Sequence, residues 1–105
     1  LELVKEGVYS LNDLPYYLSH KVADRFKIID RGYIREGYWA DLVLVDLDSP
    51  QTASRENMGY FCGWSPFEGE SFSSKVVSTF VNGNLAYNEG RILEPNKGVQ
   101  LQFDR

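Results

Sequence analysis

The stretch KVVSTFV-NG-NLAY, residues 75–87, carries the strongest fold signal of the chain. β-Branched and aromatic residues dominate its first part, and the chain returns through NLAY after Asn82 and Gly83. An Asn-Gly pair between two such segments is typical of a type I′ turn, in which both central residues need a positive φ. The stretch therefore predicts an antiparallel β-hairpin.

Further strands are expected on both sides of this hairpin. The clearest is ADLVLVDL, residues 40–47, whose consecutive apolar residues predict a central strand buried on both faces. Upstream, RGYIREG (31–37) carries glycines near its two ends, as a strand between tight turns does. Downstream, a turn at 88–90 leads to a strand at 91–93, and the alternating apolar residues of 99–103 predict an edge strand.

The beginning of the chain is predicted to be helical. LVKEG, residues 3–7, resembles the last turn of a helix that ends at a glycine. A second helix is expected to have Asn12 as its N-cap, which places Pro15 in the first turn, where proline is tolerated. Ser19 is expected to cap a third short helix.

This order of elements gives a mixed α and β fold class. Short N-terminal helices are expected over residues 1–27, followed by a small, mainly antiparallel β-sandwich over residues 28–105. The chain starts at Leu1 without a methionine, and the first helix resembles the end of a longer one. We therefore expect the carboxyl-terminal part of a longer protein.

A connection of 26 residues, 49–74, separates the two best strands. Loops of this length in compact domains are often functional or docked onto a neighbour. Aromatic residues recur along it, at Tyr60, Phe61, Trp64, Phe67 and Phe72. Burial of each would contribute roughly 1.5–3 kcal/mol, so we expect WSPFEG, residues 64–69, to clamp the loop onto an adjoining surface. The alternative is a segment that reaches into a neighbouring active site or gates it.

Composition excludes several classes of protein. With 43% hydrophobic and 14% aromatic residues, the 105-residue chain can form a core and does not read as disordered. Its net charge is −4, from 11 basic and 15 acidic residues, which disfavours nucleic acids and anionic membranes as partners. No apolar stretch approaches the roughly 20 residues that span a bilayer.

The residues that could carry chemistry stand alone in the sequence. His20 has no histidine or cysteine at a metal-ligand spacing, so a polar residue at the start of a short helix is favoured over a ligand or general base. Cys62 has apolar neighbours and is expected to be a small, reduced core residue rather than a nucleophile, which fits a cytoplasmic location. One histidine and one cysteine exclude a His₃, HExxH or cysteine-only zinc site within the chain.

Two further patterns are assigned to local structure. Asp41 and Asp46 flank the strand at 40–47, and each is expected to accept nearby backbone N–H bonds, after Gly37 and at the strand exit. Gly32 and Gly37 do not form a phosphate loop, because no GxGxxG pattern and no following helix accompany them. The sequence thus assigns no catalytic, cofactor-binding or metal residue to this chain.

Three segments together resemble the carboxyl end of a dihydroorotase, in the cyclic amidohydrolase branch of the amidohydrolase superfamily. They are ADRF (23–26) with RGYIREG (31–37) and ADLVLVD (40–46), then SPFEG (65–69), then VSTFVNG (77–83) ending at Tyr87 and Gly90. The glycine and ADLVL block marks the superfamily, and SPFEG before the hairpin points towards dihydroorotase. The resemblance covers about residues 2–93, with Lys21-Val22-Ala23 where the family has Asn-Pro-Ala.

The resemblance implies a (β/α)₈ barrel with a β-sandwich built from both chain ends. Residues 1–27 would be the last barrel helices and residues 28–105 the carboxyl-terminal share of the sandwich, with the missing barrel as their partner. It further implies a zinc enzyme that interconverts N-carbamoyl-aspartate and dihydroorotate, a small-molecule substrate of pyrimidine synthesis. None of the family's metal or catalytic motifs stands in this chain, so no site residue is carried over and the chain alone is expected to be inactive.

Other interpretations stay open at this point. The chain could be the tail of a hydantoinase-type or allantoinase-type enzyme or of an inactive relative. It could also be a free-standing β-rich interaction module that binds a partner through its aromatic loop. A homo-oligomer is compatible with each of them.

Overall fold

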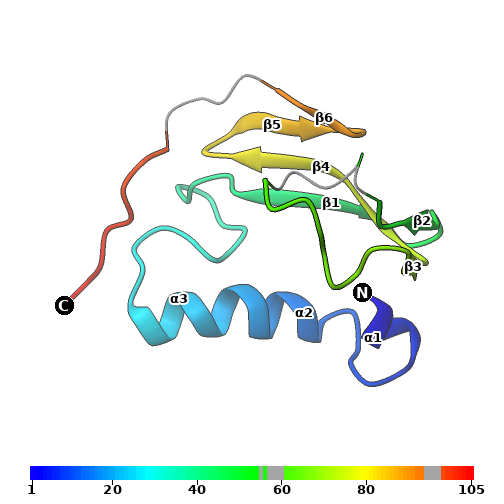
Figure 1. The fold of residues 1–105 in the computed structure, drawn as a ribbon. Helices are drawn as coiled ribbons and strands as arrows, with labels where there is room; N and C mark the ends of the chain where they lie inside the picture. Colours follow the sequence, from blue (N-terminus) through cyan, green and yellow to red (C-terminus); the bar gives the residue numbers. More distant parts are fainter. Residues whose placement is uncertain (55, 57–60, 94–97) are drawn as a thin grey trace.

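The computed structural model describes residues 1–54, 56, 61–93 and 98–105. The helical part begins with α1 (Glu2–Lys5). After a turn, α2 (Asp13–Pro15), the π-helical turn η1 (Tyr16–His20) and α3 (Lys21–Phe26) follow one another without a break. Figure 1 shows this longer helical segment running along one side of the β elements. The predicted helical start is confirmed.

Both predicted features of the first helices are confirmed. Gly7 has a φ of +79° directly after α1, and its N–H donates to the Val4 carbonyl at 3.1 Å. The Val8 N–H donates to the Leu3 carbonyl at 2.9 Å, which completes a Schellman motif. Asn12 occupies the N-cap position of α2, which ends at Pro15, although its side chain makes no capping hydrogen bond. Instead, the Asp13 carboxylate accepts the Ser10 N–H at 2.8 Å.

The predicted helix boundary at Ser19 is wrong. Ser19 lies inside η1, and its hydroxyl donates to the Gly32 carbonyl at 2.8 Å. A serine hydroxyl that finds a partner outside its own helix does not compete with the helical backbone. Ser19 therefore joins the helical segment to residues 31–37 instead of starting a new helix.

The main sheet has four antiparallel strands in the order β1-β4-β5-β6. These strands are β1 (Leu42–Asp46), β4 (Lys75–Val81), β5 (Asn84–Asn88) and β6 (Arg91–Ile92). Asn82 and Gly83 join β4 to β5 with φ values of +53° and +80°, as a type I′ turn requires. The predicted hairpin is therefore confirmed, and so is the turn before β6.

β1 is not the central strand that its sequence predicts. It lies at the edge of the sheet beside β4, and Val43, Leu44 and Val45 are 58%, 51% and 40% exposed. Neighbouring residues of a strand point to opposite faces, so both faces of β1 are open to solvent. An apolar run of this kind is typical of a strand covered on both sides, and the described part of the chain does not cover it.

Two other predicted strands are wrong. Residues 31–37 are turns and irregular chain, and none of them pairs with a strand of the described residues. Gly32 and Gly37 have φ values of +87° and +82°, as expected for turns. The tail forms a single bridge between Phe103 and Ile28 in place of an edge strand. The Ile29 N–H donates to the Gln102 carbonyl beside this bridge at 2.9 Å.

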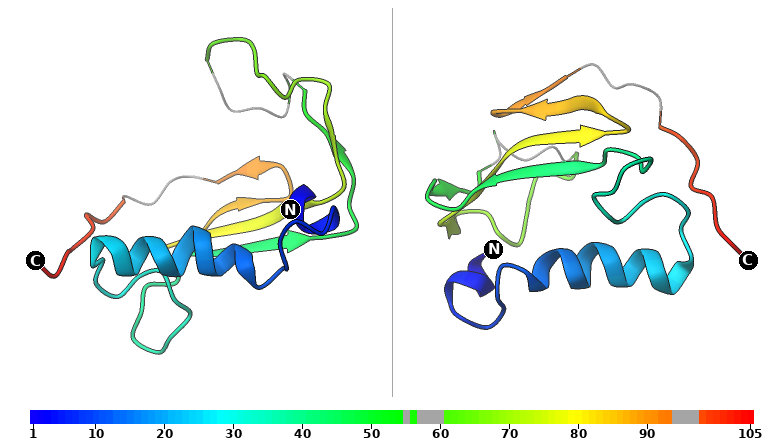
Figure 2. Two further views of the ribbon diagram at one scale, coloured as in Figure 1. Left: turned by 90° about the horizontal axis from the view of Figure 1, so that it is seen from below. Right: turned by 180° about the vertical axis from the view of Figure 1, so that it is seen from behind.

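The long connection has a two-stranded ribbon at its base. β2 (Gln51–Thr52) pairs with β3 (Ser71–Phe72), and Ala53 extends the pairing through 2.9 Å bonds with Glu70 and Gly69. Beyond the ribbon, residues 61–70 form an arm that projects away from the main sheet (Figure 2). Tyr60, one of the aromatic residues expected to dock, lies outside the described residues.

The chain buries little of its surface. Among the described residues, Ala23 and Ala53 are the buried apolar residues, and no large side chain is fully buried. The accessible surface is 8489 Å², whereas a globular monomer of this size exposes roughly 6000 Å². The radius of gyration is 15.6 Å, against about 13 Å for a compact domain of this length. No helix in the described part of the chain is long and apolar enough to cross a membrane.

Candidate functional site

The described residues bring together no group of three or more His, Cys, Asp or Glu side chains that could hold a metal ion. The side chains singled out in the sequence are spread over different parts of the fold. Each is therefore described by its own surroundings.

His20 packs against an aromatic ring. It lies at the junction of η1 and α3, and its imidazole stacks on Tyr33 with the ring centroids 4.2 Å apart and the planes at 6°. The Tyr33 hydroxyl donates to the Asp24 carboxylate at 2.7 Å, and the Arg35 guanidinium lies 4.0 Å from the Tyr33 ring. The hydrogen bond to Asp24 raises the pKa of the Tyr33 hydroxyl. This geometry fastens residues 33–35 onto the helix.

Cys62 is exposed, so the prediction of a core residue is wrong. It lies on the arm, where its sulfur is 3.2 Å from the Trp64 carbonyl oxygen. The apolar neighbours that suggested burial, Phe61 and Trp64, are themselves 108% and 62% exposed. Apolar neighbours in the sequence do not by themselves bury a side chain, and the described residues provide no covering surface beside the arm.

Asp41 contacts residues that are distant in sequence, rather than the local turn that was predicted. Its Oδ1 accepts the Asn82 N–H at 2.8 Å, and its Oδ2 pairs with the Arg31 guanidinium. The Arg31 side chain is only 10% exposed and lies 5.0 Å from the Trp39 ring. Asp46 does act locally as predicted, since its Oδ1 accepts the Asp48 N–H at 3.0 Å.

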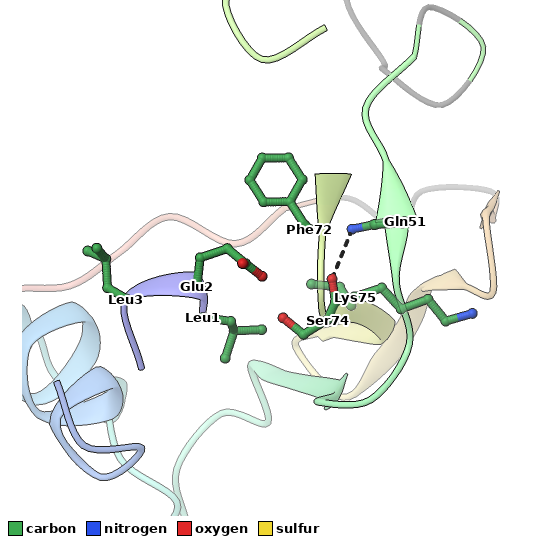
Figure 3. A pocket seen from close by; sticks show the side chains of 8 residues that line it. Leu1, Glu2, Leu3, Gln51, Phe72, Ser74 and Lys75 are labelled. Carbon is green, nitrogen blue, oxygen red and sulfur yellow. Dashed lines mark hydrogen bonds between the residues drawn. The ribbon is translucent and has the colours of Figure 1, made fainter. Parts of the chain in front are cut away.

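An open pocket of about 380 Å³ lies between α1 and the ribbon (Figure 3). It is lined by Leu1, Glu2, Leu3, Gln51, Phe72, Ser74, Lys75 and Val76. Glu2 Oε1 accepts both the N–H and the hydroxyl of Ser73, each at 2.6 Å. These two bonds lower the pKa of the Glu2 carboxyl group, the hydroxyl contributing more, and Lys5 adds a smaller effect.

The residues around this pocket link α1 to the ribbon and form no catalytic arrangement. Its carboxylate is already held by Ser73, and no nucleophile lies beside a general base among the residues that line it. Glu2 and Ser73 are 71 residues apart, so no sequence pattern could have paired them. Similarly, the Asp41 contact with Asn82 spans 41 residues.

Comparison with known proteins shows which enzymes this chain resembles. The chain is 38% identical over 87 residues to a dihydroorotase of Clostridium acetobutylicum, a match that covers 83% of this chain and 20% of that protein. It is 38% identical over 84 residues to an allantoinase of Desulfitobacterium hafniense, covering 80% of this chain and 19% of that protein. The chain is related to the cyclic amidohydrolases. No protein-family model matches it.

The fold of the chain agrees with this relationship to the cyclic amidohydrolases. The structure of the dihydropyrimidinase from Brevibacillus agri superimposes with a TM-score of 0.81 at 31% identity, covering 88% of this chain and 20% of that one. The chain thus spans about a fifth of the length of the relatives it matches. The resemblance noted in the sequence is confirmed at the level of the cyclic amidohydrolases.

Proposed function

We propose that this chain is a non-catalytic, carboxyl-terminal portion of a metal-dependent cyclic amidohydrolase. The parent enzyme would interconvert N-carbamoyl-aspartate and dihydroorotate, by closing or hydrolysing a ring C–N bond, as a step of pyrimidine synthesis. The observation that carries this proposal is the 38% identity to one fifth of a dihydroorotase. A reduced Cys62 fits a cytoplasmic enzyme.

The exposed surface supports a role as part of a larger molecule. The chain exposes roughly 2500 Å² more than a monomer of its size should, and β1 is open on both faces although its sequence is that of a covered strand. We assign residues 1–27 to the last helices of a (β/α)₈ barrel and residues 28–105 to a β-sandwich. The rest of the parent would cover the open surfaces, with a homo-oligomer as a further possibility for part of them.

Zinc would be bound by the proposed parent enzyme, outside the residues described here. A cyclic amidohydrolase of this kind uses its metal to activate the attacking water. The described residues of this chain offer no cluster of metal donors, so they do not fit a zinc site. The catalytic and metal-binding residues of the parent would therefore lie outside this chain, which alone should be inactive.

One observation supports allantoin as an alternative substrate of the parent enzyme. The allantoinase of Desulfitobacterium hafniense matches this chain with the same 38% identity as the dihydroorotase. Dihydroorotate and allantoin are both cyclic amides, and the residues that would distinguish these two substrates are expected in the catalytic part of the parent. An inactive relative and a free-standing interaction module are the remaining alternatives.

The decisive experiment uses the longer protein that contains this chain. It would be purified with zinc and assayed against dihydroorotate, allantoin and dihydrouracil. Turnover of dihydroorotate above that of the other two is expected. Preference for allantoin would identify the parent as an allantoinase, and preference for dihydrouracil as a dihydropyrimidinase. Absence of turnover on all three substrates would contradict the proposed activity.

A further inference from the structure

The arm, residues 61–70, presents three aromatic side chains to solvent. Phe61, Trp64 and Phe67 are 108%, 62% and 56% exposed. The arm projects beyond the ribbon, away from the helical segment and the main sheet (Figure 2). Large aromatic side chains exposed together on one projecting segment favour a docking surface.

The arm is folded by its own hydrogen bonds. Ser65 organises a turn, with its Oγ accepting the Phe67 N–H at 3.1 Å and its carbonyl accepting the Glu68 N–H at 3.2 Å. The Glu70 N–H then donates to the Phe67 carbonyl at 2.9 Å. The Phe67 ring meets Phe72 of β3 edge to face, with the centroids 6.2 Å apart. A preformed surface loses less conformational entropy on binding, which favours docking.

We propose that Phe61, Trp64 and Phe67 dock the arm onto the part of the same polypeptide that lies outside these 105 residues. This inference rests on the proposed function, in which the chain is one portion of a longer protein. The relatives support a large remainder, since the chain covers only 20% of the dihydroorotase that it matches. The docking partner is therefore a surface of the parent enzyme in cis.

The exposed area favours this partner over a second copy. At their exposed fractions the three rings offer on the order of 450 Å², whereas a stable interface between separate molecules buries about 800 Å² on each partner. An intramolecular contact needs less area, because the linked partner is present at an effective concentration in the millimolar range. The arm alone is thus too small to hold two molecules together.

The side chains of the arm define the chemistry of the surface that it fits. Its three exposed side chains are aromatic, and no lysine or arginine lies between positions 61 and 74. The complementary surface is therefore apolar at its centre.

Cys62 provides a probe of the docking. In the longer protein, its alkylation by iodoacetamide would be followed on the tryptic peptide 56–75, which begins after Arg55 and ends at Lys75. We expect labelling of the native protein to be slower than that of the guanidinium-unfolded protein by about tenfold or more, at both low and high protein concentration. The double variant Phe61→Ser/Trp64→Ser should label faster than the native wild type.

The matched control is Ile34→Ser. Ile34 is 88% exposed and belongs to the segment 31–37, which Figure 2 shows on the opposite side of the molecule from the arm. This variant should leave the labelling of Cys62 unchanged. Equal labelling of the native and unfolded wild type would overturn the proposal, and protection lost on dilution would assign the arm to a second copy. Because labelling is independent of turnover, an inactive parent with a protected Cys62 would contradict the proposed activity alone.

Discussion

The carboxylate of Asp41 accepts the backbone N–H of Asn82 at 2.8 Å, and so joins the start of β1 to the turn between β4 and β5. The Gly83 N–H donates to the Ala40 carbonyl at 3.0 Å beside it. The second oxygen of Asp41 pairs with Arg31. One side chain thereby holds together three segments that are distant in the sequence.

Replacing Asp41 should destabilise the protein measurably. Asp41→Ala leaves the nearly buried Arg31 without its partner and the Asn82 N–H without its acceptor, at an expected cost of about 1–3 kcal/mol. Urea unfolding followed by tryptophan fluorescence would measure the loss, since Trp39 lies 5.0 Å from Arg31. Asp41→Asn keeps an acceptor for Asn82 and should cost less. Equal stability of wild type and Asp41→Ala would show that these contacts contribute nothing.

The features that could be predicted from the sequence depend on local chemistry. Asn82-Gly83 and the glycine after α1 each follow from the conformational preferences of one or two residues. The features that could not be predicted depend on partners far along the chain. Ser19 does not cap a helix because its hydroxyl donates to the Gly32 carbonyl, and Asp41 has no purely local role because it accepts the N–H of Asn82, 41 residues away.

A comparison of two glycines isolates a close packing contact. Gly32 and Gly37 have similar φ values, +87° and +82°, but a Cβ at Gly32 would lie 2.4 Å from the Ala23 Cβ, while a Cβ at Gly37 meets nothing within 4 Å. Gly37→Ala should cost about 1 kcal/mol from its backbone conformation alone. Gly32→Ala should cost about 1–3 kcal/mol more, because the added methyl group overpacks the contact. Similar melting temperatures for the two variants would contradict the close approach of helix and loop.

The hairpin turn gives a third prediction. Gly83 has a φ of +80°, and a β-branched residue resists positive φ, so Gly83→Val should destabilise the protein by about 1 kcal/mol or more. Gly83→Asn is the matched variant, because asparagine tolerates the left-handed region, and it should retain most of the stability. Thermal unfolding measures both. A Gly83→Val protein that melts like the wild type would contradict the importance of this turn.

Burial was the property that local sequence predicted least well. The sequence predicts that β1 and Cys62 are buried, and both are exposed in this structure. A run of apolar side chains indicates that both faces of a strand are covered in the folded protein, but it does not indicate which part of the protein covers them. The exposed Val43 and Val45 are consistent with contacts made by the remainder of the proposed parent. The same reasoning applies to the arm.

The Glu2–Ser73 contact predicts an acid-sensitive attachment of α1. Hydrogen bonds from Ser73 lower the pKa of Glu2 in the folded protein, below the usual glutamate value of about 4.3. A group with a depressed folded pKa stabilises the protein above its unfolded pKa, and this contribution is lost as the pH falls through the folded pKa. Glu2→Gln should therefore lower the melting temperature at neutral pH and flatten its fall below about pH 4.3.

The charge control for this experiment is Glu6→Gln, which removes the same charge directly after α1. An NMR titration of the Glu2 carboxyl group in the wild type should give a midpoint below that of a free glutamate, and Ser73→Ala should move this midpoint upward. Because the hydroxyl of Ser73 is the largest cause of the shift and its N–H remains in the variant, the return should be partial. A Glu2 midpoint that is the same in wild type and Ser73→Ala would contradict the role of the hydroxyl in holding α1 to the ribbon.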